Sequence, residues 1–165
     1  MKIVETLLDE MNREAKTTRR VLEAVPGDRL AWKPHEKSWS LGELASHIAT
    51  IPGVVARESI EDAFDPTQVV RRKFDNRAEI VAAFEESLAQ AREILAPMSD
   101  EWMGSTWAVV IAGQPVLRIP RGRFLRAVLL NHSYHHRGHL TVYLRLLNVA
   151  VPSIYGPSAD EDPFR

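Results

Sequence analysis

Apolar residues recur at the three- and four-residue spacing of an amphipathic helix in four segments of this 165-residue chain. Such a stripe must be buried, and the partner available to it here is the stripe of another segment. Few stretches are β-branched enough to supply a sheet. The pattern therefore predicts an all-α fold, a four-helix bundle. The segments are residues 2–24, 40–64, 76–96 and 121–147.

Local signals mark where these helices begin and end. Ser40 and Glu43 have the spacing of a capping box, so we expect the second helix to open there. Pro52, followed by glycine, should kink or break that helix because proline lacks a backbone donor. Asn76 or Asp75 can cap the third helix.

Two long connections separate the predicted helices. Residues 65–75 are polar and basic, and residues 98–120 do not have a helical pattern. Within the latter, residues 107–119 are β-branched around an Ala-Gly-Gln-Pro turn, which favours a short β-hairpin between the third and fourth helices. We therefore expect one domain over residues 1–165, a bundle with long crossover connections.

Composition excludes several classes of protein. The chain has no cysteine, so disulfides, thiolate metal sites and a cysteine nucleophile are ruled out. The net charge of −1, with both signs interspersed, argues against a nucleic-acid partner. No apolar run is long enough for a membrane span, and the start becomes charged too soon for a secretory signal. We expect a reduced, cytoplasmic protein.

Histidines carry the strongest chemical signal. Of six in the chain, four lie close together in the last helical segment. His132 and His136 are four residues apart, so their side chains share one helix face, in the middle of the apolar stripe. His135 and His139 form a second pair with the same spacing. His47 lies in the apolar stripe of the second segment and can supply a third ligand from another helix.

Each of these histidines also has a simpler interpretation. A single buried histidine such as His47 is more often a core residue with its hydrogen bonds satisfied. His135 and His139 fit a solvent-facing patch equally well, and His35 lies in a polar loop. Because all four histidines of the last segment fall within about 100° of helical arc, periodicity alone separates the two pairs only weakly.

Three sequence blocks resemble the DinB-like superfamily of helical, damage-inducible metalloproteins. They are WSLGELASHIA (residues 39–49), NHSYHHRG (131–138) and VPSIYGPSADE (151–161), and their order spans nearly the whole chain. The resemblance implies a metal site on His47, His132 and His136, with Gly138 two residues further on. Family members often have glutamine after that glycine, whereas this chain has His139, which leaves open a supporting or ligating role for it.

The implied site has chemical consequences. Three imidazoles leave coordination positions open, which is typical of catalytic rather than structural sites. Imidazole suits several divalent ions, among them Zn, Ni and Fe. The resemblance implies an S-transferase-like enzyme that activates a low-molecular-weight thiol for a small-molecule substrate, and a homodimer. Two alternatives remain: a non-catalytic metal-binding stress-response protein, and a metal-dependent hydrolase.

Other polar and aromatic residues near the motifs have two possible roles. Arg137 can bind an anionic group of a cosubstrate or can form an interhelical salt bridge. Trp32 and Trp39 can line the mouth of a pocket or can pack against the core. The sequence leaves these alternatives open.

Overall fold

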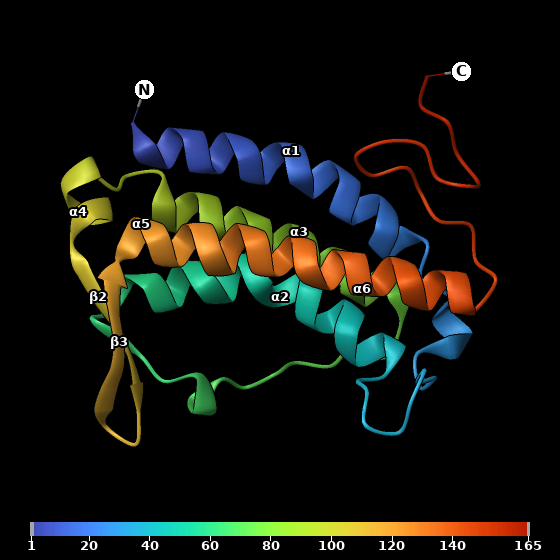
Figure 1. Ribbon diagram of the computed structural model, residues 1–165, viewed down its shortest axis with the longest axis horizontal. Helices are drawn as coiled ribbons and strands as arrows, with labels where there is room; N and C mark the ends of the chain where they lie inside the picture. The colour runs from blue at the N-terminus through green and yellow to red at the C-terminus, as the bar shows by residue number, and fades with distance from the viewer. Residues whose placement is uncertain (1, 165) are drawn as a thin grey trace.

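The computed structural model describes residues 2–164 and shows a mostly helical chain with four major helical runs. Figure 1 shows these runs side by side along the long axis of the molecule. They are α1 (Ile3–Glu23), α2 (Leu41–Ile60), α3 (Arg77–Leu95) and a last run made of α5 (Arg121–Phe124), the π-helical segment η3 (Leu125–Asn131) and α6 (His132–Leu146). The predicted helical bundle is confirmed.

The capping signals in the sequence act as expected. The backbone N–H of Glu43 donates to Ser40 Oγ at 3.1 Å, and the backbone N–H of Ser40 donates to Glu43 Oε2 at 2.8 Å. Asn76, rather than Asp75, caps α3 and accepts from the backbone N–H of Glu79 at 2.9 Å. These side chains satisfy backbone donors that a helix leaves unpaired at its start.

Helix α2 runs through Pro52 without a break, although Figure 1 shows its axis changing direction along its length. The buried N–H of Gly53 donates to Ser87 Oγ of α3 at 2.7 Å, so a donor beside the proline finds a partner on the neighbouring helix. A side chain at Gly53 would meet Ser87 and Gln90, which shows how closely α2 and α3 approach. The expected extension of this helix to residue 64 is wrong, because α2 ends at Ile60.

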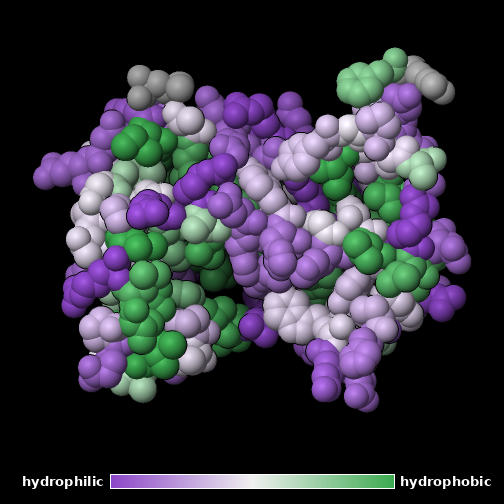
Figure 2. All heavy atoms as spheres, in the orientation of Figure 1, coloured by the Kyte–Doolittle hydropathy of each residue, from purple (hydrophilic) through white to green (hydrophobic). Residues whose placement is uncertain are grey.

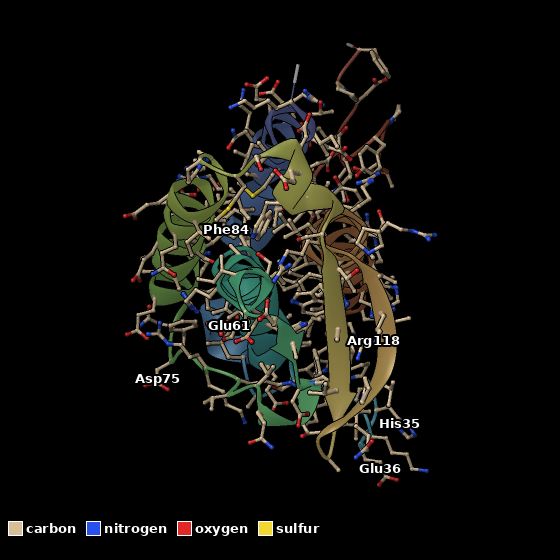
Figure 3. The ribbon with its side chains drawn as sticks, turned by 90° about the vertical axis from the view of Figure 1, so that its left-hand side faces the viewer. His35, Glu36, Glu61, Asp75, Phe84 and Arg118 are labelled. Atoms are coloured by element: carbon tan, nitrogen blue, oxygen red, sulfur yellow. The ribbon has the colours of Figure 1, made fainter. Side chains whose placement is uncertain are left out.

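A three-stranded sheet closes one end of the bundle. Its order is β1 (Ala63–Phe64), β2 (Thr106–Ile111) and β3 (Gln114–Pro120), with β1 parallel and β3 antiparallel to β2. The predicted hairpin is confirmed, and its turn places Ala112 and Gly113 at positive φ. Figure 3 views the molecule from this end, with the hairpin beside the last helical run.

One short helix was not predicted from the sequence. Residues 98–120 contain α4 (Asp100–Gly104), which Ser99 caps by accepting from the backbone N–H of Trp102 at 3.1 Å. A five-residue helix is too short to show apolar periodicity, so only its cap could have signalled it. Two single-turn 3₁₀ helices, η1 (Gly27–Arg29) and η2 (Pro66–Gln68), lie in other connections.

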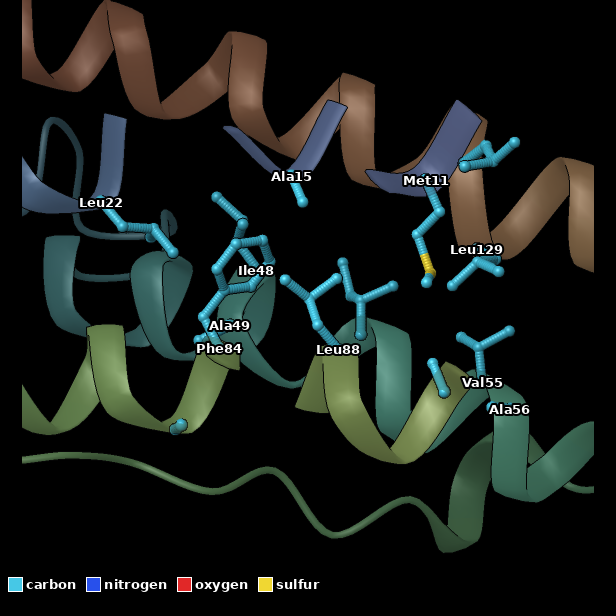
Figure 4. Packing of buried hydrophobic residues seen from close by; sticks show 14 of the residues in the cluster. Met11, Ala15, Leu22, Ile48, Ala49, Val55, Ala56, Phe84, Leu88 and Leu129 are labelled. Carbon is cyan, nitrogen blue, oxygen red and sulfur yellow. The ribbon is translucent and has the colours of Figure 1, made fainter. Parts of the chain in front are cut away.

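The core lies between the four helical runs. Leu22, Ile48, Phe84 and Leu129 come from one run each and are at most 3% exposed. Figure 4 shows these side chains spread along the space between the helices and pointing into it. Within residues 2–164, no helix is both long and apolar enough to cross a membrane.

Candidate metal centre

Three histidines from two helices meet on one side of the bundle. His47 lies on the second turn of α2, while His132 opens α6 and His136 follows one turn later. One nitrogen from each ring lies within 4.8 Å of the others. The Nε2 atoms of His47 and His132 are 3.0 Å apart. Two ligands of a tetrahedral ion, each about 2.0–2.1 Å from it, are about 3.3 Å apart, so this spacing is close to that of a coordinated pair.

The environment keeps these imidazoles neutral, as metal ligation requires. Burial, with a smaller contribution from His132 and Arg71, lowers the pKa of His47 to about 4. Burial and the neighbouring histidines lower the pKa of His136 to about 3, and burial also lowers the pKa of His132. Because their pKa values lie below the ordinary histidine value, these rings stay unprotonated at neutral pH and keep lone pairs available.

One buried nitrogen of the cluster has no hydrogen-bond partner. His136 is 9% exposed, and its Nδ1 atom is unpaired among residues 2–164. An unsatisfied buried polar atom costs about 1–3 kcal/mol, so such atoms are uncommon in folded proteins. A neutral set of three imidazoles with spare lone pairs fits a divalent ion of the Zn, Ni or Fe type.

Trp39, in the loop before α2, packs against two histidines of the triad. Its ring stacks on His136 at a centroid distance of 5.5 Å and meets His47 edge-on at 5.0 Å. Trp32 lies elsewhere: it packs edge-on against Tyr143 at 5.6 Å, and the Tyr143 hydroxyl donates to the Trp39 carbonyl at 3.3 Å. Trp39 therefore belongs to the site, whereas Trp32 supports the packing behind it.

The second histidine pair lies on the outside of α6. His135 and His139 are exposed, with ring centroids 4.1 Å apart, and they form a second possible metal-binding group together with His136. His35 is exposed in its loop and accepts from the backbone N–H of Lys37 at 3.2 Å.

Arg137 is a structural residue, one of the two alternatives that the sequence left open. It is 1% exposed and its guanidinium pairs with Glu14 Oε2 at 2.7 Å. It also donates to Thr18 Oγ1 and to the hydroxyl of Tyr155. Arg137 thus joins α6 to α1 and to the C-terminal tail, and its partners do not include the triad.

A cavity of about 220 Å³ opens beside the triad. His47, His132 and Arg71 line it together with apolar residues of α2, the connection after it and η3. Figure 2 shows the surface hollowed beside the hydrophobic residues that gather at the sheet end of the bundle. A smaller pocket of about 60 Å³, lined by Glu43, His47 and Lys73 among others, adjoins it.

Two parts of this site, Arg71 and the π-helical segment η3, were not predicted from the sequence. The connection after β1 supplies Arg71 to the cavity wall, and its basic run was the only signal available. The π-helical turn of η3 directly precedes His132. Such turns are wider than α-helical ones and often occur at functional sites, so they change where later side chains point.

Comparisons with known proteins find relatives over most of this chain. Two proteins of Bacillus subtilis strain 168, both described as uncharacterized, are similar in sequence. YrdA is 27% identical in an alignment of 158 positions that covers 90% of this chain and 85% of YrdA. YjoA is 28% identical over 130 residues, 78% of this chain and 80% of YjoA.

Solved structures share the fold. A DinB-like protein from Bacillus cereus ATCC 10987 has a TM-score of 0.73 at 24% identity, covering 92% of this chain and 97% of its own. The DinB-like protein YjoA from Bacillus subtilis has a TM-score of 0.70 at 21% identity, covering 90% and 96%. The DinB family model matches residues 1–162. This chain therefore belongs to the DinB family.

Proposed function

We propose that the protein holds one divalent metal ion on His47, His132 and His136 and is an S-transferase-like enzyme that activates a low-molecular-weight thiol. The supporting observation is the convergence of three neutral imidazoles beside a cavity. No carboxylate joins this group of three in the described part of the chain. A site with three protein ligands keeps a position open for a reactant.

A bound divalent ion would supply Lewis acidity, which lowers the pKa of a coordinated thiol toward neutral pH. Burial keeps the imidazoles of His47 and His136 neutral at that pH. Trp39 fixes two of the rings by packing on them and shields one side of the group from water.

The cavity beside His132 gives the second reactant a place next to the thiol. In the transfer, the thiol proton passes to solvent and a new sulfur–carbon bond forms. The leaving group of the electrophile departs with the electron pair of the bond that breaks. Because the chain has no cysteine, the thiol comes from outside.

The test is a thiol-consumption assay with cysteine as the thiol and 1-chloro-2,4-dinitrobenzene as the electrophile. We expect turnover by metal-loaded protein, loss of turnover after chelation, and loss of both metal and turnover in His47→Ala. The control His35→Ala changes a distant exposed histidine and should keep both. Unchanged turnover in His47→Ala would overturn the proposal.

The same assay separates the alternatives. Turnover of p-nitrophenyl acetate without added thiol, abolished by His47→Ala, would point to a hydrolase instead. Metal binding without turnover of either kind would point to a non-catalytic metal-binding protein. The homodimer implied by the family resemblance and the cytoplasmic location expected from composition stay predictions; light scattering tests the first.

A further inference from the structure

The connection between β1 and α3 brings three consecutive cations to the rim of the candidate metal centre. Arg71, Arg72 and Lys73 all line the smaller pocket beside His47. Figure 1 shows this connection running alongside α2, away from the bundle core. Of the three cations, Arg71 alone also lines the larger cavity.

Of the three cations, Lys73 has a carboxylate partner, whereas Arg72 stacks on an aromatic ring. Lys73 Nζ lies 2.6 Å from Glu43 Oε1, and this contact, followed by the hydrogen bond from the Ser40 backbone, lowers the pKa of Glu43 to about 2. The guanidinium of Arg72 lies over the Phe74 ring, 5.1 Å from its centroid.

Arg71 also stacks on a ring, but that ring belongs to the candidate metal centre. Its guanidinium lies 4.6 Å from the centroid of Trp39, the ring that packs on His47 and His136. None of the ion pairs formed among residues 2–164 includes Arg71 or Arg72, so no carboxylate of this part of the chain pairs with either arginine. Stacking on an aromatic ring orients a guanidinium and leaves its N–H edges available.

The larger cavity is mostly apolar beyond this cation. Val54 and Val55 of α2, Phe64 of β1 and Val128 of η3 line it. Val70, which is 84% exposed, stands at its rim next to Arg71. Apolar walls with a few fixed polar groups are typical of small-molecule sites.

We infer that the second reactant is a compact apolar molecule bearing one carboxylate, an inference that rests on the proposed function for the role of this molecule. Its carboxylate pairs with Arg71 and its apolar body occupies the cavity toward His47 and His132. A guanidinium matches a carboxylate with two parallel hydrogen bonds. One unpaired guanidinium on the wall of this cavity fits a single negative charge better than a phosphate dianion. The cavity of about 220 Å³ is below the range typical of drug-sized ligands, which favours a body of one ring or a short chain.

The experiment measures binding by titration calorimetry on metal-loaded protein, without any thiol. The probes are 3-phenylpropionate and the neutral 3-phenylpropanamide, which has the same shape. We expect the acid to bind at least about tenfold more tightly than the amide, as a charge-assisted hydrogen-bonded pair allows. Arg71→Gln should remove this preference and leave amide affinity within about twofold.

Arg72→Gln is the matched control, since Arg72 adjoins Arg71 but does not line the larger cavity. It should keep the preference for the acid. Val54→Phe, which fills the cavity, should weaken both probes. Circular dichroism verifies that each variant is folded.

Repeating the titration on chelated protein separates two positions for the carboxylate. A preference that persists without metal and needs Arg71 supports the inference. A preference that disappears on chelation and survives Arg71→Gln places the carboxylate on the ion and overturns it, as does equal affinity for acid and amide. A preference intact in protein that consumes no thiol would overturn the proposed function alone.

Discussion

Helix α6 carries two histidine pairs of identical spacing in very different surroundings. His132 and His136 both meet a third imidazole from His47 on α2, and Trp39 stacks on His136. His135 and His139 face solvent, although their rings are 4.1 Å apart. Spacing along a helix thus brings two imidazoles together in both cases. A second helix adds the third imidazole to only one pair, and burial there keeps the rings neutral.

The largest expected effect comes from removing one ring from each histidine pair and comparing the metal affinity of the two variants. His132→Ala leaves two imidazoles on the inner side, and we expect at least about a 100-fold loss of metal affinity, more than the loss of a supporting partner causes. His139→Ala should leave the inner site loaded. Elemental analysis of untagged protein after dialysis measures both variants. Equal metal content in the two would mean that the inner triad is not the binding site.

Acid should lower the free energy of unfolding through the lowered pKa values of His47 and His136. In metal-free protein, His47 has a pKa of about 4 and His136 of about 3, both below the ordinary value of 6.5. The unfolded chain therefore binds more protons than the folded one once the pH falls below about 6.5. Stability present above that pH is lost as the pH falls toward the folded values, by at most about 1.4 kcal/mol per pH unit for each group.

Urea unfolding of metal-free protein between pH 7 and pH 5 measures this dependence. We expect His136→Gln to flatten it, because glutamine does not titrate, while His135→Gln serves as the exposed control with the same chemistry. The metal-loaded protein should keep its ion at pH 5 and release it as the pH falls toward the lowered pKa values of about 4 for His47 and about 3 for His136, because protonated imidazole cannot ligate. Metal content unchanged on acidification would contradict ligation by these histidines.

The smallest expected effect comes from Trp39, whose ring packs on two histidines of the candidate metal centre. Trp39→Leu removes the ring that packs on His136 and His47, and we expect a loss of metal affinity of about tenfold, as for other residues that orient ligands. Trp32→Leu removes a ring of the same kind that packs on Tyr143 instead. It should lower the free energy of unfolding without changing metal affinity. Similar losses of metal affinity in both variants would show a general packing effect.

Two arginines show the same difference between distance along the chain and distance in space. Arg137 is beside His136 in sequence, yet it is buried against α1 with Glu14 as its partner. Arg71 is distant in sequence, yet its guanidinium lies on the ring of Trp39. Proximity to a motif along the chain was therefore a poor guide to which cation lies near the triad.

The sequence alone determined the four helical runs, the cap at Ser40, the hairpin and the four-residue spacing within each histidine pair. Periodicity, caps and turns are local properties of the chain. Periodicity did not separate His132 and His136 from His135 and His139, since an ideal helix places all four within one broad arc. The resemblance to a family supplied that choice. The packing of α2 against the last run then decided which imidazoles meet. The tertiary structure alone decided the places of Trp39 and Arg71 and the cavity that both residues line, because loop residues without periodicity acquire their neighbours only when distant elements pack.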